Sequence, residues 1–275
     1  MILSLIEQRI KAKIEAVGTP LKDWDIQINY GIKTGFNDAF IISGEKRKEL
    51  IKQDPKSDEI IRPLLRGRDI KRYGYEFADL YLLFIPWHFP LHTDTSIQGA
   101  SEKAEQAFKK QYPAIYNHLL QYKKELSNRN KAETGIRYEW YALQRWGASY
   151  WEDFYKQKIV WTPVNSEYRF AMIESGWFFN NSVFMITNSG NENLNIILSV
   201  MNSKLFVFYL NKITSAEYQY GSKELFQTFP IPRPTTEIEQ KIEILLQTKE
   251  YTAIDQLVYQ LYRLDEEEIA FIEIQ

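Results

Sequence analysis

The stretch KIVWTPVNSEYRFAMIESGWFFNNSVFMIT, residues 158–187, decides the fold. It is rich in β-branched and aromatic residues, and turn-forming Asn, Ser and Gly residues divide it. This pattern predicts three short strands at 158–164, 168–174 and 177–186, the first two joined by a short Asn-Ser turn. Consecutive strands of this length predict a sheet at the centre of the domain.

Three more strands are predicted ahead of this stretch, at 25–30, 39–43 and 80–85, again from short β-branched and aromatic runs. A helical insertion then separates them from the later strands. Ser101 is placed to cap one of its helices, and Pro113 is placed to open the next.

Helices are also predicted at both ends of the chain. Apolar residues recur at helical spacing in 2–17, in 194–209 and, after the proline cluster at 230–234, in 238–261. We therefore expect an α+β fold, in which a twisted, partly barrel-like mixed sheet carries the functional loops. The expected division is 1–18 as a linker or docking helix, 19–235 as the main domain and 236–275 as a C-terminal helical tail.

The charge is unevenly distributed along the 275 residues, whose formal net charge is −2. From Thr236 to the end there are ten acids and three bases, which leaves 26 acids and 31 bases in the rest. An acidic tail therefore hides a mildly basic body, and a basic surface is what phosphate binding requires. The tail itself suits contact with protein better than contact with phosphate.

The chain contains no cysteine, which excludes disulfides, thiolate metal sites and a cysteine nucleophile. No apolar run approaches the roughly 18–20 residues of a membrane span, and the N-terminus does not resemble a signal peptide. We expect a cytoplasmic protein with no membrane partner.

Three motifs follow one another in the first third of the chain: GIKTGFNDAFII at 31–42, IIRPLLRGRDIKRYGY at 60–75 and LYLLFIP at 80–86. Further along come KIVWTPV, FFNNSVFMIT, ILSVMNSKLFVFYL and FPIPRP, the last of which ends at Pro234. Together these motifs resemble the TaqI-like C-terminal specificity domains of type IIG restriction–modification proteins. The resemblance covers nearly the whole of the expected main domain.

The resemblance implies sequence-specific recognition of duplex DNA by the target-recognition domain of a type IIG or IIS restriction–modification protein. A DNA adenine methyltransferase module and a nuclease module, in the same polypeptide or in a separate subunit, would act on the bound DNA. The sequence contains no NPPY-type motif, no glycine-rich loop for S-adenosylmethionine and no acid–lysine set for metal-dependent cleavage. We therefore expect a non-enzymatic chain without a cofactor, with S-adenosylmethionine and Mg²⁺ belonging to the missing modules.

The second motif is strongly basic, and its cations could bind phosphates or read guanine. Its candidate DNA-binding residues are Arg62, Arg66, Arg68, Lys71 and Arg72. The alternative is a solvated face whose arginines pair with nearby acids.

The first motif suggests a tight turn whose backbone approaches a neighbouring strand closely. Lys33, Thr34 and Asn37 are the candidates there, as donors to phosphate oxygens. The alternative is an ordinary hairpin turn with a lysine at its tip.

Cations and aromatic residues alternate in residues 129–151, which suits contacts to base edges and stacking on bases. The candidates there are Arg137, Tyr138, Tyr141 and Arg145. The alternative is a corner of the core in which the rings pack and only the arginines are solvated. A later loop adds Tyr218, Tyr220 and Lys223 as candidates, with ordinary turn chemistry as the alternative.

His88 and His92 have the spacing of metal ligands on a helix, but prolines before and between them argue against a helix. We therefore expect no metal site and no catalytic residues. The competing functions are a module that binds carbohydrate or peptide on an aromatic-rich β surface and an enzyme with an unrecognised active site.

Two surfaces would distinguish DNA binding from carbohydrate or peptide binding. A single basic strip would favour DNA, and an uncharged aromatic groove would favour the other interaction module. The cations expected to share that strip are Arg66, Arg68, Arg72 and Arg145.

Overall fold

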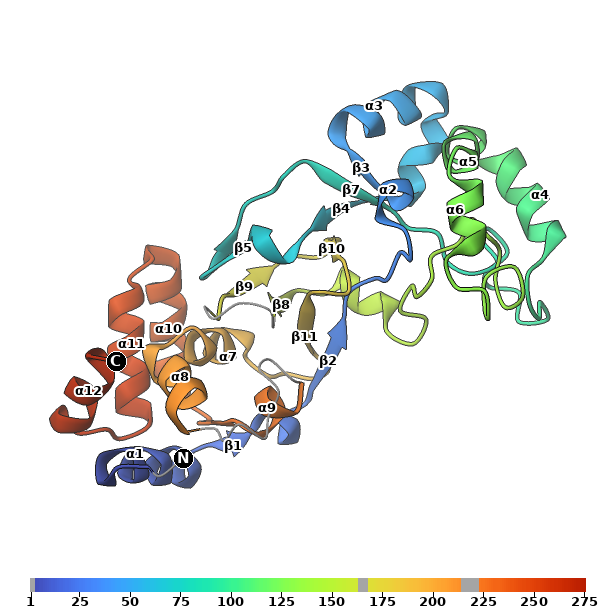
Figure 1. The fold of residues 1–275 in the computed structure, drawn as a ribbon. Coiled ribbons are helices and arrows are strands. Elements are labelled where there is room, and N and C mark those ends of the chain that lie inside the picture. Colours follow the sequence, from blue (N-terminus) through green and yellow to red (C-terminus); the bar gives the residue numbers. More distant parts are fainter. Residues whose placement is uncertain (1–2, 163–167, 214–222) are drawn as a thin grey trace.

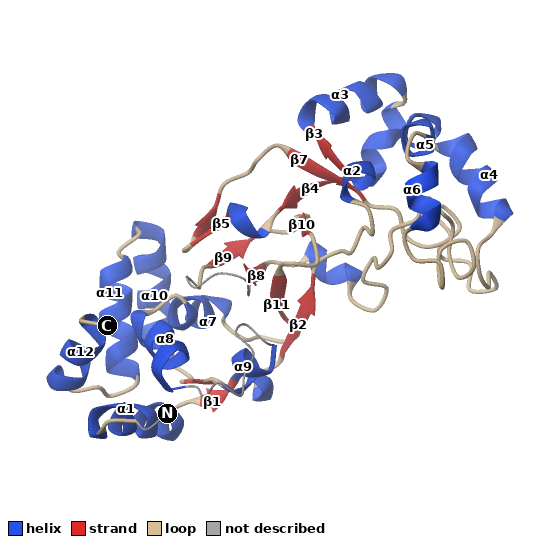
Figure 2. Ribbon diagram, in the orientation of Figure 1, coloured by secondary structure: helices blue, strands red, loops and turns tan. Residues whose placement is uncertain are grey.

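The computed structural model describes residues 3–162, 168–213 and 223–275. Strands occupy the middle of an elongated molecule, as Figures 1 and 2 show. The helices of the insertion lie at one end, and the N-terminal and C-terminal helices lie together at the other. The fold is α+β, as predicted from the sequence, and its sheets are open rather than closed into a barrel.

The central sheet contains β2 (Ile26–Tyr30), β11 (Phe184–Asn188), β8 (Lys158–Trp161) and β9 (Phe170–Ile173), in that order and all antiparallel. Successive side chains of a strand point to opposite faces. Accordingly, Ile159 and Ile186 pack into one buried cluster, while Val160 and Met185 pack into a second. This sheet therefore separates two cores and is covered on both faces.

A second sheet has the order β10 (Phe178–Phe179), β4 (Ile61–Leu65), β7 (Leu80–Leu83) and β3 (Ile41–Ser43). β10 is parallel to β4, and the other pairs are antiparallel. The single strand predicted at 177–186 is thus wrong: its first part joins this sheet and its last part joins the central one. Two short pairs complete the strands, β5 (Ile70–Lys71) with β6 (Gly74–Tyr75) and β1 (Thr19–Pro20) with β12 (Pro230–Ile231).

Five helices lie at the end of the molecule that holds the second sheet: α2 (Asn37–Phe40), α3 (Gly44–Gln53), α4 (Glu102–Gln111), α5 (Pro113–Leu120) and α6 (Lys123–Asn128). Of these, α2 and α3 make the main contacts with its strands. Ser101 caps α4 as predicted, because its hydroxyl accepts a hydrogen bond from the Ala104 amide at 3.2 Å. The strand predicted at 39–43 begins later than expected, since residues up to Phe40 form the last part of α2.

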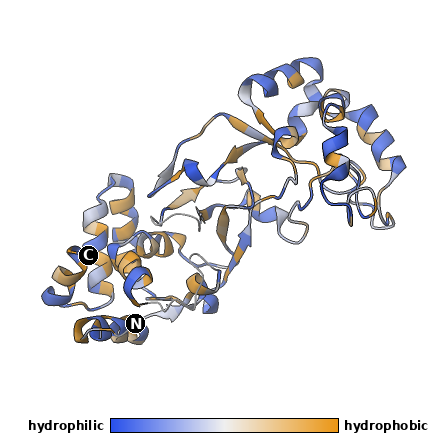
Figure 3. Ribbon diagram, viewed as in Figure 1, coloured by the Kyte–Doolittle hydropathy of each residue, from blue (hydrophilic) through white to orange (hydrophobic). Residues whose placement is uncertain are grey.

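The remaining helices gather at the other end of the molecule. They are α1 (Leu5–Val17), α7 (Leu194–Met201), α8 (Lys204–Phe208) with its π-helical continuation Tyr209–Ile213, α9 (Lys223–Thr228), α10 (Thr236–Thr248), α11 (Tyr251–Leu261) and α12 (Glu266–Glu273). Figure 3 shows apolar residues concentrated along α7, α8 and the central strands.

The acidic tail contacts the first helix of the same chain. Asp265 caps α12, and Lys13 of α1 binds Glu268 of α12 at 2.5 Å, while Arg9 binds Glu267 at 2.8 Å. Part of the tail's negative charge is therefore neutralised within the chain. No single helix among the described residues has the length and apolarity to cross a membrane; only α7 and residues 204–213 taken together do, across a 55° bend.

Candidate nucleic-acid interface

A backbone bridge joins the turn after β2 to a distant loop. The Lys33 amide donates to the Arg145 carbonyl at 3.0 Å, and the Arg145 amide donates to the Lys33 carbonyl at 2.9 Å. Residues paired in this way project their side chains to the same side. Arg145 is exposed and Lys33 is half-buried, and neither forms an ion pair within the described part of the chain. We call this pair the Lys33–Arg145 surface.

Two glycines allow the turn to adopt this path. A Cβ on Gly31 would lie 2.0 Å from the Asn180 carbonyl oxygen, so only glycine fits against that backbone. Gly35 has a φ of +79°, which favours glycine. The first motif therefore encodes a close backbone approach, as predicted from the sequence.

Thr34 and Asn37 act within this turn. Thr34 is buried, and its hydroxyl donates to the Asn37 side-chain oxygen at 2.6 Å. The candidate role of Thr34 as a phosphate donor therefore needs correction, because its hydroxyl is already committed. Asn37 is exposed at the start of α2, and the bond to Thr34 uses only its side-chain oxygen, not its amide nitrogen.

Arg129 connects the turn to the loop that carries Arg145. Its guanidinium donates to the carbonyls of Thr34, Trp140 and Ala142, and the rings of Phe40 and Tyr138 lie beside it. Burial lowers the pKa of Arg129 to about 10, so it still carries its charge at neutral pH. The sequence gives no local signal for this role of Arg129, because its acceptor Thr34 lies far away in the chain.

The aromatic residues of 129–151 pack inward. Tyr138 and Tyr141 are fully buried, with Tyr138 stacked on Trp87 at 4.6 Å and the Tyr141 hydroxyl donating to the Phe89 carbonyl at 2.8 Å. The prediction that these two tyrosines contact DNA needs correction, because no part of either ring reaches the surface. The alternative of a core corner describes them instead.

Arg137 differs from these rings because 62% of its side chain is exposed. Its guanidinium binds Glu133 at 3.3 Å and lies over the ring of Trp87 at 5.6 Å. It is accessible but partly neutralised.

A polar hollow of about 560 Å³ lies between β2 and the loop after Arg145. Gln27 of β2 is exposed there, and Asn29 donates to the buried Asp153 at 2.8 Å. Trp151 forms part of the opposite wall. The hollow thus offers the amide of Gln27, six residues before Lys33 in the chain, and the indole of Trp151, six residues after Arg145.

The basic second motif is largely committed to the fold. Arg66 binds Asp69 through two hydrogen bonds of 2.9 and 2.8 Å. Burial raises the pKa of Asp69, but the hydrogen bonds from the side chain and backbone of Arg66 outweigh it and leave that pKa below its ordinary value. Arg62 donates to the Tyr155 hydroxyl at 2.9 Å and to two backbone carbonyls.

The last cations of this motif are also paired. Lys71 lies 3.4 Å from Glu76, and Arg72 binds Asp255 of α11 at 3.2 Å. Arg68 alone in the motif is exposed without an ion pair to another described residue. The prediction of one strip shared by Arg66, Arg68, Arg72 and Arg145 is therefore wrong, because two of the four are held by acids.

The third group of candidates is described only in part. Tyr218 and Tyr220 lie outside the described residues. Lys223 begins α9, and its ammonium donates to the Ile28 carbonyl in β2 at 2.9 Å. This contact places Lys223 against the same strand that carries Gln27.

The histidines of the considered metal motif have other partners. His88 contacts Glu139 at 2.9 Å, and His92 stacks on Phe89. Glu139 also accepts hydrogen bonds from the backbone amides of His88 and Ser101, both at 2.8 Å. Across the described ranges, no group of three potential metal ligands gathers.

Comparison with known proteins gives a consistent group of relatives. Residues 62–231 match the family model of the TaqI-like C-terminal specificity domain. The type II methyltransferase M.MjaIV of Methanocaldococcus jannaschii is 21% identical over 224 residues, which cover 79% of this chain and 68% of that protein.

Two solved structures share the fold. The type IIL restriction–modification enzyme MmeI, in complex with DNA, matches with a TM-score of 0.57 and 13% identity over 94% of this chain and 36% of its own. The type IIG restriction endonuclease BpuSI matches with a TM-score of 0.50 and 12% identity over 94% of this chain and 32% of its own. The chain thus spans about a third of the length of these two enzymes.

Proposed function

Because the chain belongs to the family of TaqI-like C-terminal specificity domains, we propose that it recognises a specific duplex DNA sequence for a restriction–modification enzyme. The match covers more than half of the chain, and the fold is shared with two enzymes of this class. The choice of surface rests on one structural observation. The backbone bridge places Lys33 beside Arg145, and neither cation forms an ion pair with an acid among the described residues.

The Lys33–Arg145 surface supplies the two chemistries that DNA recognition needs. Cations bind phosphates, and an arginine can also bind guanine O6 and N7 in the major groove. Gln27 in the polar hollow carries an amide, which is the group that pairs with adenine. Asn37 and Arg68 add exposed polar and cationic groups, and we include them as secondary contacts.

The chemistry on DNA is proposed to reside elsewhere in the enzyme. A methyltransferase module would use S-adenosylmethionine and a nuclease module would use Mg²⁺, whereas this chain would contribute recognition alone. The similarity to a type II methyltransferase supports that partner. A restriction–modification system acts on cellular DNA, so we place the protein in the cytoplasm.

The decisive experiment is selection followed by titration. The full chain would be used to enrich duplexes from a pool with a randomised centre, and affinity for an enriched duplex would be measured by fluorescence anisotropy at several salt concentrations. We expect Arg145→Met and Lys33→Met each to weaken binding several-fold, and each lost phosphate contact to reduce the salt slope by about 1.

Lys48→Met provides the matched control, because Lys48 is exposed on α3 and away from the bridge. It should leave both affinity and slope unchanged. A wild-type affinity that does not vary with salt, or a pool in which no sequence is enriched, would rule out the proposed function.

A further inference from the structure

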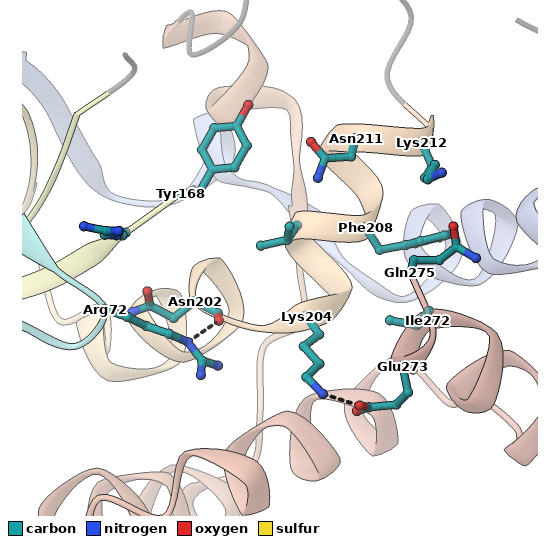
Figure 4. A pocket seen from close by; sticks show the side chains of 12 residues that line it. Arg72, Tyr168, Asn202, Lys204, Phe208, Asn211, Lys212, Ile272, Glu273 and Gln275 are labelled. Carbon is teal, nitrogen blue, oxygen red and sulfur yellow. Dashed lines mark hydrogen bonds and ion pairs between the residues drawn. The ribbon is translucent and has the colours of Figure 1, made fainter. Parts of the chain in front are cut away.

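A pocket of about 460 Å³ lies among the helices at the C-terminal end of the molecule (Figure 4). It is formed where α8 and its π-helical continuation face α12, with Arg72 at the end of β5 on one side. Its volume falls within the usual range for small-molecule sites. None of its lining residues belongs to the Lys33–Arg145 surface or to the polar hollow.

One wall of the pocket is apolar. Val207 and Phe208 come from α8, and Ile272 comes from α12. Because Val207 is half-buried, it still exposes methyl groups to the cavity. An apolar group placed against this wall would leave water and gain hydrophobic stabilisation.

The remaining wall is strongly cationic. It contains Arg72, Arg169, Lys204 and Lys212, whereas Glu273 is the single acid among the described residues that line it. Asp255 neutralises Arg72 from outside the lining, and the excess positive charge that remains attracts anions; low-dielectric walls strengthen this attraction.

These cations differ in how firmly they are held. Arg72 is fixed by Asp255 and by the Asn202 carbonyl, at 3.2 and 3.1 Å. Lys204 pairs with Glu273, but their side chains are 51% and 32% exposed, and ion pairs of this kind contribute little. Among the described ranges, Lys212 forms no ion pair within 4.0 Å, although it interacts electrostatically with Glu7 of α1 over a longer distance.

We propose that this pocket binds a small organic anion. The apolar body of the ligand lies on Val207, Phe208 and Ile272, and its phosphate or carboxylate oxygens accept hydrogen bonds from Lys204 and Lys212. The ligand displaces Glu273 from Lys204 rather than breaking the better-buried pair of Arg72. This binding is independent of duplex DNA and does not rest on the proposed function.

Isothermal titration of the full chain with three probes tests the two halves of the pocket. 1-Naphthyl phosphate carries both a flat apolar body and an anion, 1-naphthol lacks the anion, and inorganic phosphate lacks the body. We expect 1-naphthyl phosphate to bind with a stoichiometry of one, and the other two probes to bind at least about tenfold more weakly. Equal affinity for 1-naphthyl phosphate and 1-naphthol would overturn the proposal.

Substitutions then locate the site. Lys212→Met and Lys212→Glu should weaken 1-naphthyl phosphate binding, the second more than the first, and Lys204→Met should weaken it as well. Lys241→Glu is the matched control, since Lys241 is exposed on α10 and outside this pocket. The melting temperature of each variant reports whether it is folded, and unchanged affinity in the Lys212 and Lys204 variants would overturn the assignment.

A competition experiment separates this pocket from the DNA surface. Saturating duplex should leave 1-naphthyl phosphate bound, and Arg145→Met should leave its affinity unchanged. Displacement by duplex would overturn the claim of an independent site, whereas loss of DNA binding alone would refute only the proposed function.

Discussion

Replacing Arg129 by methionine tests whether one buried guanidinium organises the interface. The arginine donates to three carbonyls, those of Thr34, Trp140 and Ala142. Hydrogen bonds from a charged donor contribute roughly 1.5–3 kcal/mol each, so the three together provide about 4.5–9 kcal/mol. Burial opposes this gain: it lowers the pKa of Arg129 to about 10, and a depression of that size corresponds to about 3 kcal/mol. The difference predicts that Arg129→Met loses roughly 1.5–6 kcal/mol of unfolding free energy.

Urea denaturation followed by circular dichroism measures this loss. Arg137→Met is the matched control, because Arg137 lies in the same segment with 62% of its side chain exposed and one ion pair. That variant should lose at most about 1 kcal/mol. Hydrogen exchange should also quicken at the Lys33 and Arg145 amides in Arg129→Met. If the unfolding free energies of the two variants differ by less than about 0.5 kcal/mol, the hydrogen bonds of Arg129 do not stabilise the interface as proposed.

Three further predictions concern the scaffold. Lys158 is fully buried, and burial lowers its pKa to about 8. The folded state therefore releases this proton more readily than the unfolded chain, so the unfolding free energy of the wild type should rise by up to about 3 kcal/mol relative to that of Lys158→Met as the pH increases from 8 to 10.5. Urea titrations at several pH values would measure this rise. Gly31→Ala should lower the unfolding free energy by about 3 kcal/mol, because the new Cβ would meet a carbonyl oxygen at 2.0 Å. Gly74→Ala is the control: no atom lies within 4 Å of its Cβ position, so it should change the midpoint of urea denaturation little. Asp69→Asn should lower the unfolding free energy by about 3–5 kcal/mol at pH 7, because it leaves Arg66 unpaired. Since the pKa of Asp69 is lowered in the fold, the difference in unfolding free energy between wild type and variant should shrink as the pH falls through that pKa. A difference that does not change with pH would contradict the ion-pair explanation.

Local chemistry made much of the fold predictable. The cap at Ser101 is a side-chain signal that depends only on neighbouring residues, and it is confirmed; Asp265 caps α12 in the same way. The split of 177–186 between two sheets was not predictable in the same way, because alternation of side chains indicates a strand without indicating its partner. The change of sheet occurs after β10, where Asn180 bridges Ile32 from the first motif.

The candidate site was predictable in its residue types but not in their partners. The glycines of the first motif correctly indicated a close backbone approach at Gly31. The burial of Tyr138 and Tyr141 was not predictable, since a single sequence does not show which face of an aromatic segment meets the core. Arg129 carried no local signal, because its three acceptors are backbone carbonyls, which every residue possesses.

The density of cations along a sequence is a poor guide to the charge of an interface. Arg66 and Arg72 lie in the most basic segment, yet each binds a carboxylate that is almost fully buried. Their substitution should therefore reduce stability, because the carboxylate left behind keeps only a hydrogen bond from a backbone amide, that of Arg66 for Asp69 and that of Lys204 for Asp255. Lys33 and Arg145 lie far apart in the chain and meet only through their backbone bridge, and no described acid neutralises them. Charge removal at Arg145 should accordingly weaken DNA binding with little effect on unfolding, whereas charge removal at Arg66 should do the reverse. That opposite response distinguishes the cations that build the domain from those that face its ligand.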